Sequence, residues 1–205
     1  MVGKVCSLLV TMIAFAELAQ SSRPLASVTS VKHVPPSVND QPAGINNPSF
    51  NKSLRFNIYT FTVTAVDSGR IRETQIKAYR GELLLTNFRV RVDGAVIGAE
   101  VADLDNNRFP ELYVYSTSDG SGSFGRVYAW QFLPERKADI KLSNWQSPVG
   151  KGYMGHDSLW IERSILCRRF PLYQPGDANA HPTGGYQMMR YRLRPTGEVY
   201  ALLPE

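Results

Sequence analysis

The fold class follows from residues 112–133, which read LYVYSTSDGSGSFGRVYAWQFL. Apolar and aromatic residues fill both ends of this stretch, and the residues between them, 118–125, are mostly Gly and Ser. Runs rich in Val, Tyr and Phe favour strands, and a Gly/Ser segment between two such runs is typical of a hairpin. We therefore expect residues 112–117 and 126–133 to be strands, with residues 118–125 as the tip of the hairpin.

The same pattern recurs over most of the chain after residue 54. Runs of β-branched and aromatic residues alternate with turn residues, which is typical of an all-β domain. The expected strands are 54–66, 71–79, 82–86, 88–92, 96–104, 112–117, 126–133, 159–170, 186–194 and 198–202. The expected turns are 67–69, 92–94, 105–107 and 195–197. About eight to ten antiparallel strands predict a β-sandwich or a flattened barrel.

The N-terminal residues predict export. Lys4 precedes an apolar run over residues 5–16, and small residues follow, as in a secretory signal peptide. We expect residues 1–21 to be the signal peptide, residues 22–46 a flexible Pro-rich linker and residues 47–205 a single β domain. The apolar run is too short to span a bilayer, so we expect a periplasmic protein without a membrane span.

Charge and cysteine content argue against two classes of protein. The net charge is +5, but Arg190, Arg192 and Arg194 alternate with apolar residues. This alternation predicts a strand with one solvated and one buried face, and not a nucleic-acid surface. Signal cleavage would remove Cys6 and leave Cys167 alone, so we expect no disulfide scaffold and a buried, inert thiol.

The hairpin tip fits two nucleotide-binding patterns formally. Gly120, Gly122 and Gly125 satisfy G-x-G-x-x-G, but a strand is expected where a dinucleotide site needs a helix. Residues 120–127 also fit a kinase glycine loop, but the chain has no H-R-D or D-F-G motif. We expect no cofactor. The tip is instead slim and rich in hydrogen-bond donors, which suits entry into a narrow polar cleft, with an ordinary hairpin end as the alternative.

Two further segments carry polar groups of interest. In residues 152–157, GYMGHD, a structural role for His156 is favoured over a partner contact or a metal, because no second His has ligand spacing. Residues 103–111, DLDNNRFPE, place oxygens at positions 1, 3, 5 and 9 of a calcium-type loop. Arg108 stands where such a loop has glycine, and position 12 lacks an acid, so an Asx-rich turn is favoured and no metal is assigned.

Six segments in one order resemble the PliI family, the periplasmic inhibitors of invertebrate-type (I-type) lysozyme. They are residues 96–104, 110–115, 121–125, 152–157, 168–173 and 182–185. The resemblance implies an all-β domain, often a homodimer, that blocks the lysozyme cleft with a loop of S-G-x-Y character. Ser121 and Gly122 match that loop, and Phe124 stands at the position of the family's Tyr.

The resemblance makes I-type lysozyme the expected protein partner, and the chain is not expected to be an enzyme. The expected partner-binding loop is Gly120, Ser121, Gly122, Ser123, Phe124 and Gly125, with Tyr153 and His156 as possible secondary contacts. Ser121 would donate to the catalytic carboxylates, and Phe124 would pack on the cleft wall. One alternative is a β protein that binds envelope glycans without inhibiting lysozyme. The other is a secreted hydrolase that uses Ser121 or Ser123 with His156 and Asp157.

Overall fold

The structure is a computed structural model that describes residues 48–66, 71–134, 136–143, 145, 151–197 and 199–205. The expected signal peptide, the expected linker and the expected turn at 67–69 lie outside these residues. Gly44–Glu205 form one compact unit. Its described residues contain strands and no helix, which confirms the all-β prediction. Within them no helix is long and apolar enough to cross a membrane.

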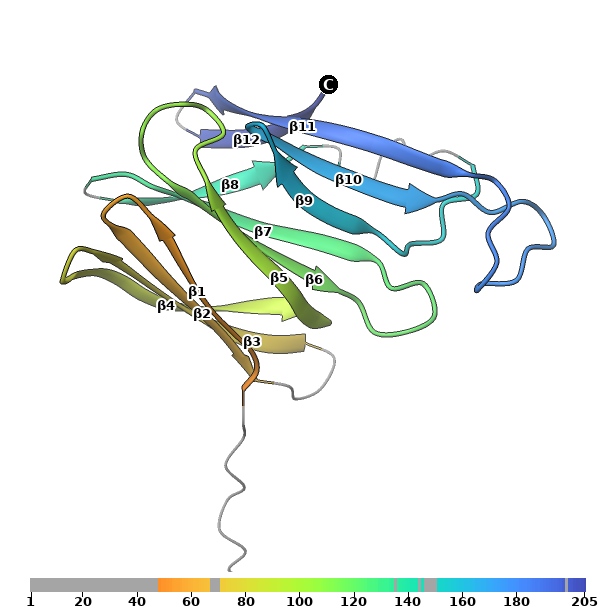
Figure 1. Ribbon diagram of the computed structural model, residues 1–205, viewed down its shortest axis with the longest axis horizontal. Helices are drawn as coiled ribbons and strands as arrows, with labels where there is room; N and C mark the ends of the chain where they lie inside the picture. Colours follow the sequence, from red (N-terminus) through yellow and green to blue (C-terminus); the bar gives the residue numbers. More distant parts are fainter. Residues whose placement is uncertain (1–47, 67–70, 135, 144, 146–150, 198) are drawn as a thin grey trace, which may run out of the picture. The chain divides into compact units, whose positions relative to one another are not determined.

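The strands form two sheets (Figure 1). The first has the order β1-β2-β3-β4, and the second has the order β5-β6-β7-β8-β12-β11-β10-β9 and is curved into a nearly closed barrel. The bounds are β1 (Pro48–Phe56), β2 (Tyr59–Val66), β3 (Ile71–Arg80), β4 (Leu83–Asp93), β5 (Ala95–Ala102), β6 (Glu111–Thr117), β7 (Gly125–Phe132), β8 (Lys137–Leu142), β9 (Ser158–Glu162), β10 (Ile165–Pro171), β11 (Tyr186–Thr196) and β12 (Val199–Pro204).

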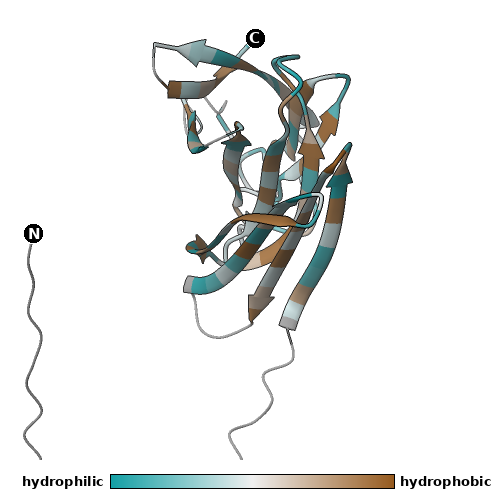
Figure 2. Ribbon diagram, turned by 90° about the vertical axis from the view of Figure 1, so that its left-hand side faces the viewer, coloured by the Kyte–Doolittle hydropathy of each residue, from teal (hydrophilic) through white to brown (hydrophobic). Residues whose placement is uncertain are grey.

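Strand β6 lies between two hydrophobic cores. Leu112 and Val114 belong to the core beneath the four-stranded sheet, whereas Tyr113 and Tyr115 belong to the core inside the eight-stranded sheet. Successive side chains point to opposite faces of a strand, so a continuous apolar run has both faces buried. The hydropathy colours of Figure 2 alternate along many of the other strands, which have one face toward a core and one toward solvent.

The chain passes from the first sheet to the second at a single residue, Gly94. Its φ is 76°, and a Cβ there would lie 1.9 Å from the carbonyl oxygen of Thr117. Only glycine fits this turn, because an L side chain would both strain the backbone and collide with it. The expected turn at 92–94 therefore joins the two sheets.

A carboxylate joins the two edges of the eight-stranded sheet. Oε2 of Glu100 on β5 accepts a hydrogen bond from the backbone N–H of Ile161 on β9 at 2.8 Å. The same oxygen accepts from the Tyr115 hydroxyl at 2.6 Å. A side chain thus supplies one of the acceptors that a neighbouring strand would otherwise provide.

Two of the expected strands are in fact hairpins. Residues 54–66 contain the end of β1, a turn at Asn57 with a φ of 51°, and β2. Residues 159–170 contain most of β9 and β10, joined through Arg163 and Ser164 with φ values of 48° and 63°. Arg and Ser are not residues that favour positive φ, so residue type did not indicate the second turn.

Other differences concern the number of strands and how they pair. The expected strands 82–86 and 88–92 form the single strand β4, and β8 was not expected. Only Ile140 of β8 is classed as buried, which is why the hydrophobic pattern is weak there. Strand β8 also pairs in parallel with β12, whereas all pairs were expected to be antiparallel.

The alternating arginines of β11 lie as expected. Arg190, Arg192 and Arg194 are exposed, while Tyr191 and Leu193 between them are buried. Cys167 on β10 is a free, buried thiol whose pKa is raised by burial. The exposed arginine face and the burial of Cys167 are as predicted.

Candidate functional site

The loop of residues 118–125 is the tip of the β6–β7 hairpin, as predicted. Its base is closed by two hydrogen bonds, from the Ser118 N–H to the Phe124 carbonyl at 2.9 Å and from the Phe124 N–H to Ser118 Oγ at 3.0 Å. At its end, the Ser123 N–H donates to the Gly120 carbonyl at 3.4 Å. The tip is therefore a folded turn with its own internal hydrogen bonds.

The second predicted segment, residues 152–157, lies directly against this loop. The backbone N–H of His156 donates to the Gly122 carbonyl at 2.7 Å. The backbones are so close that a Cβ on Gly155 would lie 1.8 Å from the Gly122 oxygen. Gly155 is thus required by the contact between the two segments, and the backbone of His156 holds the loop.

Asn179 fastens the other flank of the loop. Its Nδ2 donates to the Ser121 carbonyl at 2.6 Å, and its Oδ1 lies 3.2 Å from Nε2 of His156. The backbone carbonyl of Asn179 accepts a hydrogen bond from the Tyr173 hydroxyl at 2.9 Å, which fixes the position of Asn179. The backbone of His156 and the side chain of Asn179 therefore hold the backbone of the tip from two separate loops.

Phe124 lies partly within the loop. Its ring meets the Tyr153 ring edge to face, with 5.6 Å between centroids, and the residue is 36% exposed. A Cβ on Gly122 would lie 2.4 Å from the Phe124 ring. Gly122 thus makes room for Phe124, which is a different role from the close approach of a partner that the sequence suggested. The exposed part of the ring is still available to a partner.

A buried ion pair supports this arrangement from below. Arg168 on β10 and Asp157 have side chains that are 1% and 0% exposed, and Arg168 Nε lies 2.6 Å from Asp157 Oδ1. Arg168 Nη2 donates to the Tyr153 hydroxyl at 2.6 Å, and that hydroxyl donates to Asp157 Oδ2 at 2.7 Å. The Gly125 N–H donates to the same carboxylate oxygen at 2.8 Å. The end of the loop is therefore bonded directly to the buried pair.

Aromatic rings surround the guanidinium group of Arg168. Its Cζ lies 4.4 Å from the centre of the Trp145 ring and 5.0 Å from that of Phe170. Burial lowers the pKa of Arg168, but the hydrogen bond and charge of Asp157 outweigh this, so the pKa lies above its ordinary value. Burial raises the pKa of Tyr153, and the hydrogen bond to Asp157 raises it further. Arg168 stays charged and Tyr153 stays neutral at physiological pH.

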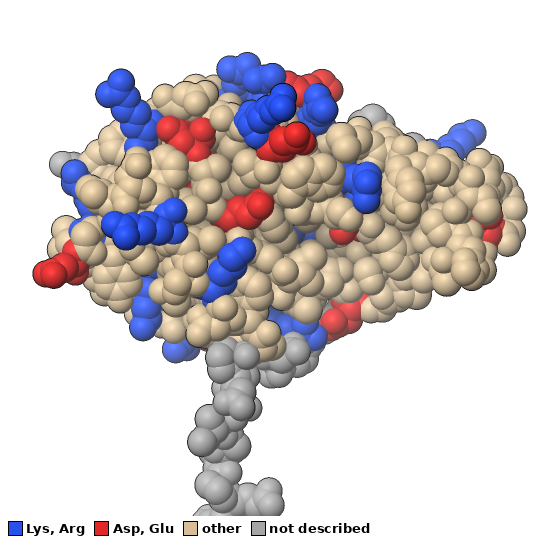
Figure 3. Space-filling view, in the orientation of Figure 1, with Lys and Arg blue, Asp and Glu red and all other residues tan. Residues whose placement is uncertain are grey.

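The end of the molecule that carries the loop has few charged side chains on the face shown in Figure 3. Gly120 and Ser121 are exposed, and a Cβ on Gly120 would meet nothing within 4 Å. A groove of about 520 Å³ lies beside residues 152–154, which precede His156, and is lined by Gly152, Met154 and Tyr173 among others. This end offers hydroxyl, backbone and aromatic groups to a partner.

The bonds of His156 and Asp157 bear on the hydrolase alternative. The Asp157 carboxylate is bonded to Arg168, Tyr153 and the Gly125 N–H, whereas the His156 ring bonds to Asn179. In a Ser-His-Asp triad the carboxylate orients the imidazole, and the imidazole orients the serine. Here the Asp157 carboxylate is hydrogen-bonded to Arg168 and not to the His156 ring.

Three residues that shape the site, Arg168, Trp145 and Asn179, had no role predicted from the sequence, and Asp157 was considered only for a hydrolase. Arg168 and Asp157 form the buried pair, Trp145 donates from Nε1 to the Gly125 carbonyl at 3.1 Å, and Asn179 holds Ser121. The adjacent arginines of β10 were a usable signal. Neighbours in a strand face opposite sides, so one of Arg168 and Arg169 had to face the interior.

At the opposite end of β6 the structure brings three carboxylates together. Ligand oxygens of Asp103, Asp105 and Glu111 all lie within 4.8 Å of one another. The first two accept N–H groups of Asn107, which confirms the Asx-rich turn. An all-oxygen set of this kind can hold a hard cation.

Comparisons with known proteins give no family for this chain. No protein-family model matches it, and no curated protein is significantly similar to it.

Proposed function

We propose that this chain is a periplasmic inhibitor of I-type lysozyme that blocks the glycosidase cleft with the loop of residues 118–125. The observation that carries the proposal is that an exposed, slim tip is already fastened on both flanks, by His156 and by Asn179. A loop that is ordered before binding loses little conformational entropy on binding, so more of the contact energy contributes to affinity.

The chemistry of the tip suits a lysozyme-type cleft. Such a cleft holds two carboxyl groups, one protonated and one ionised, and both can accept hydrogen bonds. Ser121 is exposed at the tip and can donate its hydroxyl hydrogen to them. Gly120 beside it adds no side chain that would keep the tip out of a narrow cleft.

The aromatic side of the loop would contact the rim of the cleft. Phe124 is partly exposed and backed by Tyr153, so it forms a rigid apolar surface next to the polar tip. Aromatic groups held in this way are frequent anchors at protein interfaces. His156 lies behind the loop and would act by positioning it.

The test is the hydrolysis of bacterial cell walls by an I-type lysozyme, titrated with the purified mature protein. We expect stoichiometric loss of activity, with chicken-type and goose-type lysozymes unaffected. Ser121→Ala should abolish the inhibition, whereas Ser53→Ala, at an exposed position of β1, should leave it intact.

Failure to inhibit any of the three lysozymes at micromolar protein would overturn the proposal. Binding to cell-wall fragments in the absence of lysozyme would then favour the envelope-binding alternative. Equal inhibition by the wild type and Ser121→Ala would place the inhibitory contact outside the tip.

A further inference from the structure

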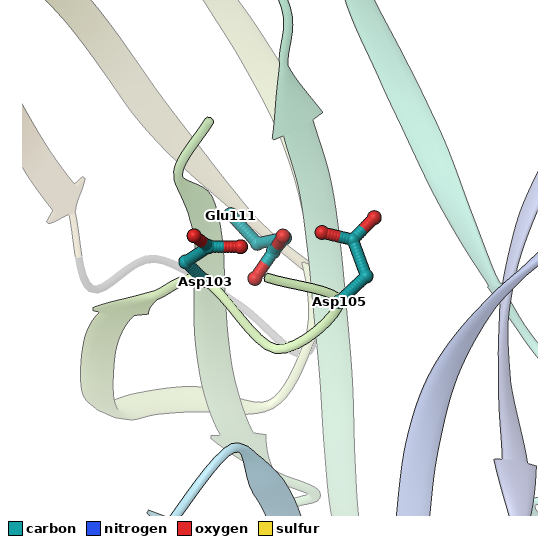
Figure 4. Close-up of side chains that lie close together, drawn as sticks. All are labelled: Asp103, Asp105 and Glu111. Atoms are coloured by element: carbon teal, nitrogen blue, oxygen red, sulfur yellow. The ribbon is translucent and has the colours of Figure 1, made fainter. Parts of the chain in front are cut away.

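The loop between β5 and β6 gathers acidic side chains at one point. Figure 4 shows the carboxylates of Asp103 and Asp105, from the loop, turned toward that of Glu111, the first residue of β6. Their ligand oxygens lie within 4.8 Å of one another. Like charges this close repel each other, and a cation between them would turn that repulsion into attraction.

Two buried oxygens at this place have no hydrogen-bond partner among the described residues. Glu111 is 0% exposed, and its Oε1 has no donor, although Oε2 accepts from the Leu104 N–H at 2.7 Å. Gln131, its partner on β7, is also 0% exposed, and its Oε1 likewise has no donor. Buried acceptors are almost always satisfied, so a pair of unsatisfied oxygens points to a missing ligand that accepts lone pairs.

The orientation of the Gln131 amide is fixed by its nitrogen. Nε2 donates to the Phe109 carbonyl at 3.0 Å and lies 3.3 Å from Asn107 Oδ1, both in the loop that carries the carboxylates. The other amide atom is therefore an oxygen, which can accept but cannot donate a hydrogen bond. Glu111 on β6 and its cross-strand neighbour Gln131 on β7 thus each contribute a buried oxygen without a donor.

Charge also favours a cation. The ion pairs among the described residues do not involve Asp103, Asp105 or Glu111. A positive charge among these carboxylates would offset their mutual repulsion.

The sequence departs from a calcium loop at two positions, and the backbone conformation of Arg108 accounts for the first of them. Arg108 stands at position 6, where glycine usually provides a left-handed turn, and its φ is 71°. Its N–H donates to Asp103 Oδ2 at 2.9 Å, which holds the turn. The second departure is the missing acid at position 12, and here Glu111 at position 9 supplies a buried carboxylate instead.

We propose that Asp103, Asp105 and Glu111 bind a calcium ion. The donor set is all oxygen, which excludes a preference for zinc or copper, for which His or Cys ligands are usual. Calcium accepts six to eight oxygens in flexible geometry, whereas magnesium requires a near-ideal octahedron. Water and the neighbouring Gln131 oxygen can complete the calcium shell. The ion would fasten the base of the β6–β7 hairpin, whose other end carries the loop 118–125.

The test uses the full mature protein, freed of metal with a chelator and passed into chelator-free buffer. Calorimetric titration with CaCl2 should give saturable binding with a Kd at or below about 1 mM and a stoichiometry of about one. Calcium at about 100 times Kd should raise the unfolding midpoint by roughly 5 to 10 °C. MgCl2 at the same concentrations should have a smaller effect.

Substitutions test whether Asp105 and Glu111 bind the calcium ion. Glu111→Gln keeps the shape of the side chain but removes its charge, so we expect loss of the calcium-induced shift with a native circular dichroism spectrum. Asp105→Asn, at a less buried position, should weaken binding at least about tenfold and serves if Glu111→Gln fails to fold. Asp139→Asn, an exposed acid on β8, should bind calcium like the wild type.

Absence of both binding heat and a thermal shift in wild-type protein at about 5 mM CaCl2 would overturn the proposal. Unchanged calcium affinity in Asp105→Asn would also overturn it. None of these measurements involves lysozyme, so their outcome is independent of the proposed inhibition.

Discussion

At the scale of single residues, the buried support beneath the loop 118–125 depends on one arginine, Arg168. Arg168 and Arg169 are adjacent on β10, and one is buried while the other is exposed. The pattern of a strand could predict that one of the two faces inward, but it could not say which carboxylate would meet it. Asp157 lies in an irregular segment whose path is set by tertiary contacts, so the pair became visible only in the structure.

Replacing Arg168 should destabilise the domain far more than replacing its neighbour. Arg168→Met leaves the Asp157 carboxylate buried without its cation, which costs about 3 to 5 kcal/mol. Arg169→Met removes only a cation–π contact over the Tyr186 ring, worth about 0.5 to 1 kcal/mol at an exposed site. Urea unfolding of the two variants measures the difference. Similar, small losses in both would show that the buried pair contributes little to stability.

A pair of glycines tests whether the position of the loop matters. Gly155 and Gly176 both have a φ of 94°, so alanine strains the backbone similarly at the two positions. At Gly155 the new Cβ would also meet the Gly122 carbonyl oxygen at 1.8 Å, whereas at Gly176 it would meet nothing within 4 Å.

We expect Gly155→Ala to move the loop and raise the inhibition constant at least about tenfold, equivalent to about 1.4 kcal/mol. Gly176→Ala should inhibit I-type lysozyme as the wild type does. The measurement is the inhibition titration, with circular dichroism to confirm folding. Equal inhibition by a folded Gly155→Ala variant and the control would contradict the view that this contact positions the loop.

At the scale of strands, hydrophobic pattern predicted the elements with a strong core face and missed those without one. The β6–β7 hairpin was expected because β6 is buried on both faces and its run of apolar residues is continuous. Strand β8 has a single residue classed as buried, and its register is set by parallel pairing with β12, which is distant in sequence. The turn at Arg163 and Ser164 was missed because neither residue type favours positive φ.

The contact between β5 and β9 should depend on Glu100. Glu100→Ala removes the acceptor of the Ile161 N–H and of the Tyr115 hydroxyl, at a cost of about 1.5 to 3 kcal/mol. Hydrogen exchange of the Ile161 amide should accelerate, and the urea midpoint should fall. Glu73→Ala breaks only an exposed ion pair on the four-stranded sheet and should cost less than about 1 kcal/mol. Unchanged exchange at Ile161 in Glu100→Ala would show that the contact contributes nothing to the closure.

At the scale of the whole domain, the two sheets give the loop a rigid base. One core lies beneath the four-stranded sheet and the other inside the eight-stranded sheet, and β6 and β7 contribute to both. The loop is therefore the short connection between the two most enclosed strands. The sequence could place its residues at a hairpin tip, but the supports from residues 152–157 and Asn179 come from distant segments and required the fold.

The most direct test of the proposed inhibition is amide hydrogen exchange in the loop 118–125, measured with and without one equivalent of I-type lysozyme. We expect binding to slow exchange at Gly120 and Ser121, which are exposed at the tip, while exchange in the exposed strand β1 stays unchanged. Unchanged exchange at the tip in a complex that forms, with protection elsewhere on the domain, would contradict the proposal that this loop enters the cleft.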